Sequence, residues 1–150
     1  MANEIKIVEG VFLDTLNPRN YALKNEYFSN LLSTAFMILP CVDRIVHEPI
    51  QVVKGFLSGS YLKEEFPNNY TAELERHSRG LALELAWKGW DIDTATRAAY
   101  EIYDKVSSLD TEKIKILINV DKKRLYIGRE FKETSIVEKT SGQERVIRKD

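Results

Sequence analysis

Cysteine and histidine are almost absent from this chain. Cys41 is the single cysteine, which excludes an internal disulfide and a zinc site made of cysteines. We expect Cys41 to be a small buried apolar residue in a reducing compartment. The two histidines, His47 and His77, lie at no spacing typical of a metal site, so we expect ordinary surface or capping residues and no bound metal.

Long apolar runs and catalytic signatures are also missing. No stretch reaches eighteen apolar residues, and the first ten residues, MANEIKIVEG, lack the features of a secretory signal, which predicts a cytoplasmic protein with no membrane contact. The sequence has no glycine-rich phosphate loop, no GxSxG motif and no paired-carboxylate signature. We therefore expect no catalytic residues, no cofactor and no enzyme activity. A small enzyme stays an alternative, which a deep pocket with His47 or His77 beside buried carboxylates would support.

The composition is that of one compact core with unevenly distributed charge. The chain has 150 residues, of which 43% are hydrophobic and 30% charged, with only two glutamines and two methionines, a balance that leans towards a thermophilic source. Residues 1–110 hold 11 basic and 16 acidic side chains, whereas residues 111–150 hold 11 and 7. The two parts are therefore expected to face different partners.

Hydrophobic residues in the first 110 positions recur mostly at helical spacing. We expect a helix near the N-terminus, a long helix from Asn17 to Pro40, a further helix after Pro49, and two more helices. Of these two, one runs from Thr71 to about Lys88 and the other from Ile92 to about Val106. The segment YLKEEFPNNY is expected to be a polar connector.

The spacing at which hydrophobic residues recur changes from 3.6 to 2 residues after about residue 110. Ile114, Ile116 and Ile118 alternate with polar or outward positions, a turn is expected at DKKR, and TSIVEK is a further short strand. The predicted fold class is α+β, a mainly helical bundle followed by a small antiparallel β-element of two to three strands. The predicted domains are a helical bundle over 1–110, a β-subdomain over 111–139 and a flexible polar tail over 140–150.

The segment LALELAWKGWDIDTATRAAY, residues 81–100, looks most like a motif. We interpret it as a corner between two helices, in which Gly89 ends the first helix in a left-handed conformation and Trp90 packs back on it. Asp91 or Asp93 then caps the second helix. A calcium loop lacks its other ligands here, and a DNA-reading helix would need more basic residues.

The cations of the C-terminal strands accompany two aromatic residues, Tyr126 and Phe131, a mixture that can follow phosphates and stack on unpaired bases. The structural alternative is that lysines protect exposed strand edges from aggregation. A second patch of basic residues is expected on the helical part of the chain. The candidate nucleic-acid-binding residues are Lys122, Lys123, Arg124, Arg129, Lys132, Arg76, Arg79, Lys88 and Arg97.

The layout from NPRNYALKNEYFSNLLSTAF through DTATRAAYEIYDKV to IKILINVDKKRLYIGREF resembles the small subunit of archaeal type I-A CRISPR effector complexes (Cascade). The resemblance covers the whole chain, and it carries no short motif from which a functional residue could be transferred. It implies a non-catalytic subunit that packs beside the backbone subunit and helps to hold guide RNA and single-stranded DNA during antiviral defence.

The sequence also supports an alternative function and predicts self-association. The alternative to a CRISPR subunit is a stand-alone adaptor or inhibitor encoded by a mobile element, for which size and composition fit equally well. Exposed strand edges and the uneven charge also predict self-association into an oligomer.

Overall fold

The computed structural model describes residues 6–109 and 112–149 of the chain. Its helices are α1 (Leu13–Leu16), α2 (Asn25–Ile45), α3 (Gly59–Glu65), α4 (Ala72–His77) and α5 (Ile92–Ser107). Its strands are β1 (Lys6–Val8), β2 (Val11–Phe12), β3 (Gln51–Lys54), β4 (Ala82–Ala86), β5 (Ile114–Asn119), β6 (Arg124–Arg129), β7 (Ser135–Thr140) and β8 (Gln143–Lys149).

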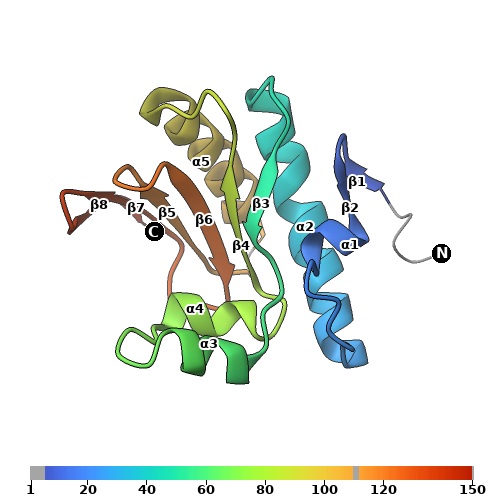
Figure 1. The fold of residues 1–150 in the computed structure, drawn as a ribbon. Coiled ribbons are helices and arrows are strands. Elements are labelled where there is room, and N and C mark those ends of the chain that lie inside the picture. Colours follow the sequence, from blue (N-terminus) through green and yellow to red (C-terminus); the bar gives the residue numbers. More distant parts are fainter. Residues whose placement is uncertain (1–5, 110–111, 150) are drawn as a thin grey trace.

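A six-stranded sheet organises the molecule (Figure 1). Its strand order is β3-β4-β6-β5-β7-β8, and β1 and β2 form a separate small sheet. Neighbouring strands of the large sheet are antiparallel except β5 and β7, which run parallel. The strands on both sides of α5 therefore belong to one sheet.

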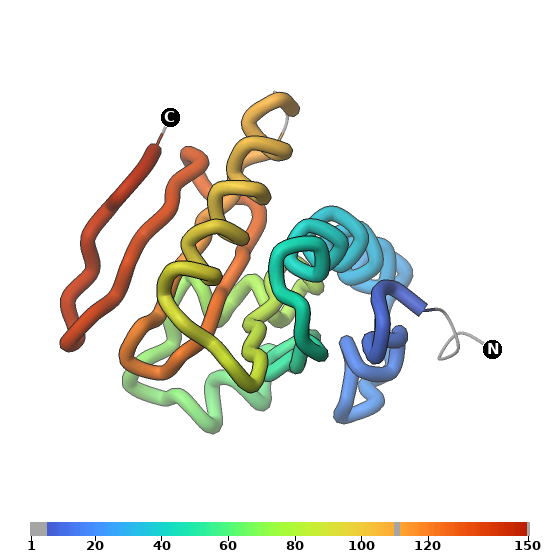
Figure 2. The backbone as a smooth tube through the Cα atoms, turned by 90° about the horizontal axis from the view of Figure 1, so that it is seen from above, coloured from blue at the N-terminus to red at the C-terminus, as the bar shows by residue number. Residues whose placement is uncertain are grey.

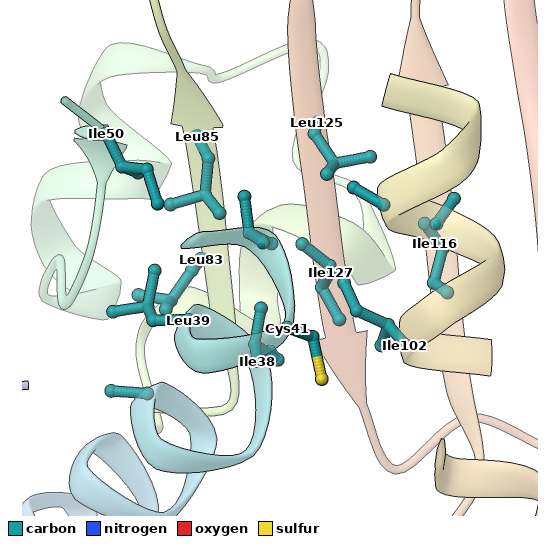
Figure 3. Close-up of a cluster of buried hydrophobic side chains, with 14 of the residues drawn as sticks. Ile38, Leu39, Cys41, Ile50, Leu83, Leu85, Ile102, Ile116, Leu125 and Ile127 are labelled. Atoms are coloured by element: carbon teal, nitrogen blue, oxygen red, sulfur yellow. The ribbon is translucent and has the colours of Figure 1, made fainter. Parts of the chain in front are cut away.

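The long helices α2 and α5 lie side by side on one face of this sheet, which we call the helix face (Figure 2). The short helices α3 and α4 lie on the opposite side, called here the second face. The core lies between the helix face and α2 and α5, where Ile38, Ile102 and Ile116 are fully buried (Figure 3). Burial of such side chains is the main source of stability.

The predicted fold class is wrong: the protein is an α+β structure with a six-stranded mixed sheet, not mainly a helical bundle with a small β-element. The expected boundary at residue 110 lies between α5 and β5, and one hydrophobic cluster contains residues from both sides of it. Residues 143–149, expected in a flexible tail, form β8. The high content of charged residues concealed this strand from a hydrophobicity-based prediction.

The N-terminal half differs most from its prediction. In the segment expected to begin with a helix, residues 1–5 lie outside the described part, and β1, β2 and the single turn of α1 follow. The long helix starts at Asn25, not at Pro18, because both side-chain amide atoms of Asn17 bond the backbone of Tyr21 in a loop. It continues through Pro40 to Ile45 although proline cannot donate a backbone hydrogen bond.

Two further helices were predicted where strands occur. The segment after Pro49 forms β3, and the helix expected from Thr71 to about Lys88 ends at His77 and is followed by β4. The break is at Gly80, whose φ of +74° suits glycine, and a Cβ there would lie 2.6 Å from the carbonyl oxygen of Tyr27. Conversely, the first half of the expected polar connector YLKEEFPNNY belongs to α3.

The segment 81–100 is therefore a corner between a strand and a helix. Gly89 has no positive φ; its N–H donates to the carboxylate of Glu48. Trp90 is buried and its ring lies 6.1 Å from that of Trp87. Asp91 caps α5 by accepting the Thr94 N–H at 2.7 Å, which confirms the predicted start of that helix.

The period-2 segments are confirmed as β5, β6 and β7, and Cys41 is buried as expected. Within the described residues, no helix combines the length and the apolar character needed to cross a lipid bilayer.

Candidate functional site

The second face of the sheet is the part of the molecule where polar and apolar side chains meet in an ordered pattern. The strand registers place one residue of each strand in a row across it, in the order Lys54, Glu84, Tyr126, Leu117, Val137 and Val146. The row begins with an ion pair and ends in three aliphatic side chains. Its two ends therefore suit different environments.

One end of the second face is closed by α4. The hydroxyl of Tyr126 donates to the backbone carbonyl of Glu73 at 2.8 Å, and burial raises the pKa of this phenol. Gly128 makes this position of the ring possible, because a Cβ there would lie 2.3 Å from the Tyr126 hydroxyl oxygen. The ring is only 4% exposed, so Tyr126 is not available to stack on a base.

His77 is the last residue of α4 and is completely buried, which corrects the expectation of a surface or capping residue. Its Nδ1 lies 2.9 Å from the carbonyl oxygen of Gly55. Since a carbonyl only accepts, Nδ1 carries the proton and Nε2 does not. Burial lowers the pKa of His77 to about 4, so the imidazole is neutral near pH 7 and serves as packing against the Tyr126 ring.

Ion pairs border the closed end. Glu84 accepts from Lys54 at 2.9 Å and lies 3.9 Å from the Arg124 guanidinium. Burial alone would raise the pKa of the Glu73 carboxylate. Lys115 donates a hydrogen bond to this carboxylate, and the bond helps to hold the Glu73 pKa below its usual value. Partly buried pairs such as these position side chains more than they add stability.

The rest of the second face, over β5, β7 and β8, has no described helix above it and forms an open groove of about 660 Å³. Its apolar wall comprises Ala72, Phe131, Val137 and Val146. Its charged and polar lining comprises Arg76, Lys115, Glu130, Lys132, Glu133, Ser135 and Glu144. An apolar strip with charges of both signs along it is typical of a surface that binds protein.

Of the nine candidate nucleic-acid-binding residues, four are held in contacts within the fold. Arg76 donates to the backbone carbonyls of Arg129 and Glu130, and its guanidinium lies 4.3 Å from the centre of the Phe131 ring. Arg79 makes two bonds to Glu75, at 2.7 and 2.9 Å, which lower the Glu75 pKa.

Arg129 and Arg124 complete this group. Arg129 forms a largely buried ion pair with Glu112 and also donates to the Thr34 hydroxyl. Arg124 lies near Glu84 and donates to the carbonyls of Lys122 and Lys123. These arginines hold loops and strands in place, so their positive charge is largely offset locally.

The other five candidates are divided between three places. Lys122 and Lys123 lie in the β5–β6 turn, and Lys88 lies in the β4–α5 turn at the same end of the sheet. Arg97 is on α5, on the other side of the molecule, and Lys132 borders the groove. The structure therefore places three of the nine residues, all exposed lysines, in turns at one end of the sheet.

Sequence reasoning missed the residues that give the second face its character: Lys115 was assigned only to a basic strand, and Val146 to a tail. The partners of Lys115, Glu73 and Glu144, lie far away in the sequence. The dipeptide Ser141-Gly142, a hairpin signal, could have indicated β8 and hence Val146.

Comparison of the chain with protein-family models, with curated proteins and with solved structures finds no match in any of the three. In the described residues, no group of three or more histidine, cysteine or acidic side chains could hold a metal ion.

Proposed function

We propose that this chain is a binding protein that takes up a segment of another protein on the second face of its sheet, along the groove beside β7 and β8. The observation that carries this proposal is the contrast along one row of residues. Tyr126 is sealed under α4, whereas Val146, two strands beyond Leu117, is 56% exposed at the edge of the sheet.

The chemistry of the groove suits a peptide in an extended conformation. Phe131 and Val137 offer apolar contacts, and Lys132 and Glu133 offer charges of opposite sign at its border. The groove ends at the edge strand β8, whose unpaired backbone groups can hydrogen-bond to an added strand. Binding of this kind is non-covalent and requires no chemical reaction by the protein.

A library of random peptides displayed on phage tests this function. We expect selection against the full chain to enrich peptides that alternate apolar and charged residues. The Phe131→Ala variant should bind them about tenfold more weakly or worse, because truncating a central aromatic contact usually has a large effect. Phe36→Ala is the matched control, since Phe36 is an exposed phenylalanine on α2. Failure to enrich any peptide, or equal binding by both variants, would contradict the proposal.

Weak nucleic-acid binding is a second candidate, favoured by one observation. The pairing of Leu85 with Leu125 sets Lys88 and Lys122 three residues beyond the same point on neighbouring strands, so both lie at the same end of the sheet. Such a group can contact phosphates without reading bases, which makes binding strongly dependent on salt.

Fluorescence anisotropy with single-stranded DNA and RNA tests this second candidate. The Lys88→Glu/Lys122→Glu variant should bind more weakly at low salt than the wild type, whereas Lys63→Glu on α3 should not. Absence of wild-type binding at low salt would eliminate this candidate.

Membership of a CRISPR effector complex stays a prediction, as do the antiviral role and the cytoplasmic location. The resemblance depended on a helical bundle followed by a separate β-element, and the continuous sheet does not support that layout. The stand-alone adaptor or inhibitor agrees better with a protein-binding face.

A further inference from the structure

The outer edge of β8, the last strand of the large sheet, has no other strand beside it among the described residues. The loop between β7 and β8 has only two residues, Ser141 and Gly142, with φ of 54° and 74°, as in a type I′ turn. The carboxylate of Asp121 accepts both of their N–H groups, at 2.7 and 2.9 Å, and so holds the turn in place. The geometry of the hairpin then follows from its turn.

In a hairpin of this type, the pair that closes the loop, Thr140 and Gln143, exchanges backbone hydrogen bonds, and successive pairs alternate. Glu144 and Val146 are therefore in non-hydrogen-bonded pairs with β7. Their N–H and C=O groups point away from the sheet, towards solvent. These two residues offer four backbone groups to an added strand.

The opposite edge of the sheet differs because the N-terminal segment lies beside it. Directly after β3, the Phe56 N–H donates to the Leu16 carbonyl at 2.8 Å, and a Cβ on Gly55 would lie 2.1 Å from the same oxygen. Beyond β8, Figures 1 and 2 show no other described segment. Strand addition is thus open at one edge of the sheet and hindered at the other.

We propose that a second copy of this chain pairs with β8 in antiparallel fashion, about a twofold axis at Val146, to join two sheets into one. This inference depends on the proposed function, because it names an occupant for the same edge. Pairing about this axis brings each Val146 against the other, and it covers the most exposed of the large apolar side chains described.

The charges of β8 complement themselves in this arrangement. Its sequence QERVIRK has the acidic Glu144 near one end and the basic Lys149 at the other. Both side chains belong to the second face, because Glu144 pairs with Lys139 and Lys149 pairs with Ser135. In the antiparallel dimer, each Glu144 lies near Lys149 of the second copy, whereas parallel pairing would bring like charges together.

Contacts on the helix face hold β8 in place, although its pairing with β7 is irregular between Val146 and Arg148. The Arg148 guanidinium lies 4.6 Å from the centre of the Tyr103 ring and 5.5 Å from that of Tyr100, both on α5. Arg145 lies 3.6 Å from Glu138 on the neighbouring strand. Because these contacts already order the strand, dimer formation costs little conformational entropy.

Sedimentation velocity over a range of concentrations tests the inference with the full 17.3 kDa chain. We expect the wild type to reach twice that mass. Val146→Lys should raise the dimer dissociation constant about tenfold or more, because two like charges then meet at the axis. Val53→Lys is the matched control: Val53 is an exposed valine on β3, at the other edge, and its substitution should leave the dimer intact.

A charge exchange tests the antiparallel register itself. Glu144→Lys and Lys149→Glu should each weaken the dimer, whereas an equimolar mixture of the two variants should form heterodimers, since every contact between positions 144 and 149 then joins opposite charges. Circular dichroism would establish that each variant is folded.

Three results would overturn the inference: a wild type that stays monomeric at high concentration, a dimer that is insensitive to Val146→Lys, or variants that fail to complement each other. The peptide selection would be unaffected by any of them, because it depends on Phe131 in the groove. A wild-type dimer that enriches no peptide would instead contradict the proposed function alone.

Discussion

The helix face of the sheet is covered by α2 and α5 over its central strands, whereas the second face is sealed only beneath α4. Neighbouring residues of β5 illustrate the difference: Ile116 is fully buried against α2 and α5, and Leu117, which points the other way, is half-buried. The helix face has continuous apolar contacts. The second face combines ion pairs, two buried polar rings and an apolar strip that ends in solvent.

The difference between the faces indicates a division of roles. Stability comes mainly from the helix face, where long helices exclude water from aliphatic side chains. The second face retains accessible apolar and charged groups, and these are needed for recognition rather than folding. Three sets of substitutions test this division, in order of decreasing expected effect on the free energy of unfolding.

The first change compares alanine at adjacent positions of one strand. Ile116→Ala should lower the free energy of unfolding by about 2–5 kcal/mol, because it leaves a cavity in a sealed core. Leu117→Ala should cost about 1 kcal/mol, since its side chain is already partly in water. Urea denaturation measures both. Equal losses would mean that the two faces support the fold equally.

The second test concerns the pH dependence of the free energy of unfolding, which arises from His77 at the end of α4. Because burial holds the His77 pKa near 4, the unfolded chain binds a proton between about pH 6.5 and 4 that the folded protein does not. The free energy of unfolding should therefore fall as the pH falls through this window, by up to about 3 kcal/mol.

Denaturation at a series of pH values measures this effect. His77→Asn removes the titrating group but retains a donor for the Gly55 carbonyl, so this part of the pH dependence should disappear. His47→Asn is the control, because His47 is exposed and its substitution should leave the slope unchanged. The same slope in the wild type and in His77→Asn would show that the burial of His77 is not its source.

The third and smallest change removes a charge from the second face. Glu84→Gln leaves Lys54 and Arg124 without their carboxylate and should cost about 1 kcal/mol or less, because these pairs remain partly hydrated. Glu101→Gln removes the more exposed pair with Arg44 and should cost less still. Thermal unfolding at low and high salt compares them; a larger loss for Glu101→Gln would reverse the contrast.

The parts of the fold that were predictable have local causes. Helix α5 has a capping aspartate at Asp91 and an amphipathic period, and both are properties of consecutive residues. Likewise β5 alternates buried and half-buried positions in the way that its sequence alternates. For these elements, local preference and tertiary environment agree.

The segment LALELA shows why other parts were not predictable. Leucine, alanine and glutamate favour helices, yet these residues form β4, whose backbone pairs with β3 on one side and β6 on the other. Two ladders of hydrogen bonds and the burial of Leu83 and Leu85 outweigh a helix preference of a few tenths of a kcal/mol per residue, by about an order of magnitude. Nothing in the segment itself reports those neighbours.

The candidate site shows the same difference between local sequence and contacts with distant segments. The sequence identified which residues carry charge, but four of the nine candidate cations turned out to be occupied by partners within the fold, such as Arg129 with Glu112. The starts of α4 and α5 and the alternation of β5, β6 and β7 were readable from the sequence, because they depend on residues a few positions apart. The open edge at β8 and the contact of Lys115 with Glu73 were not, because they join segments that the chain brings together only when its core closes.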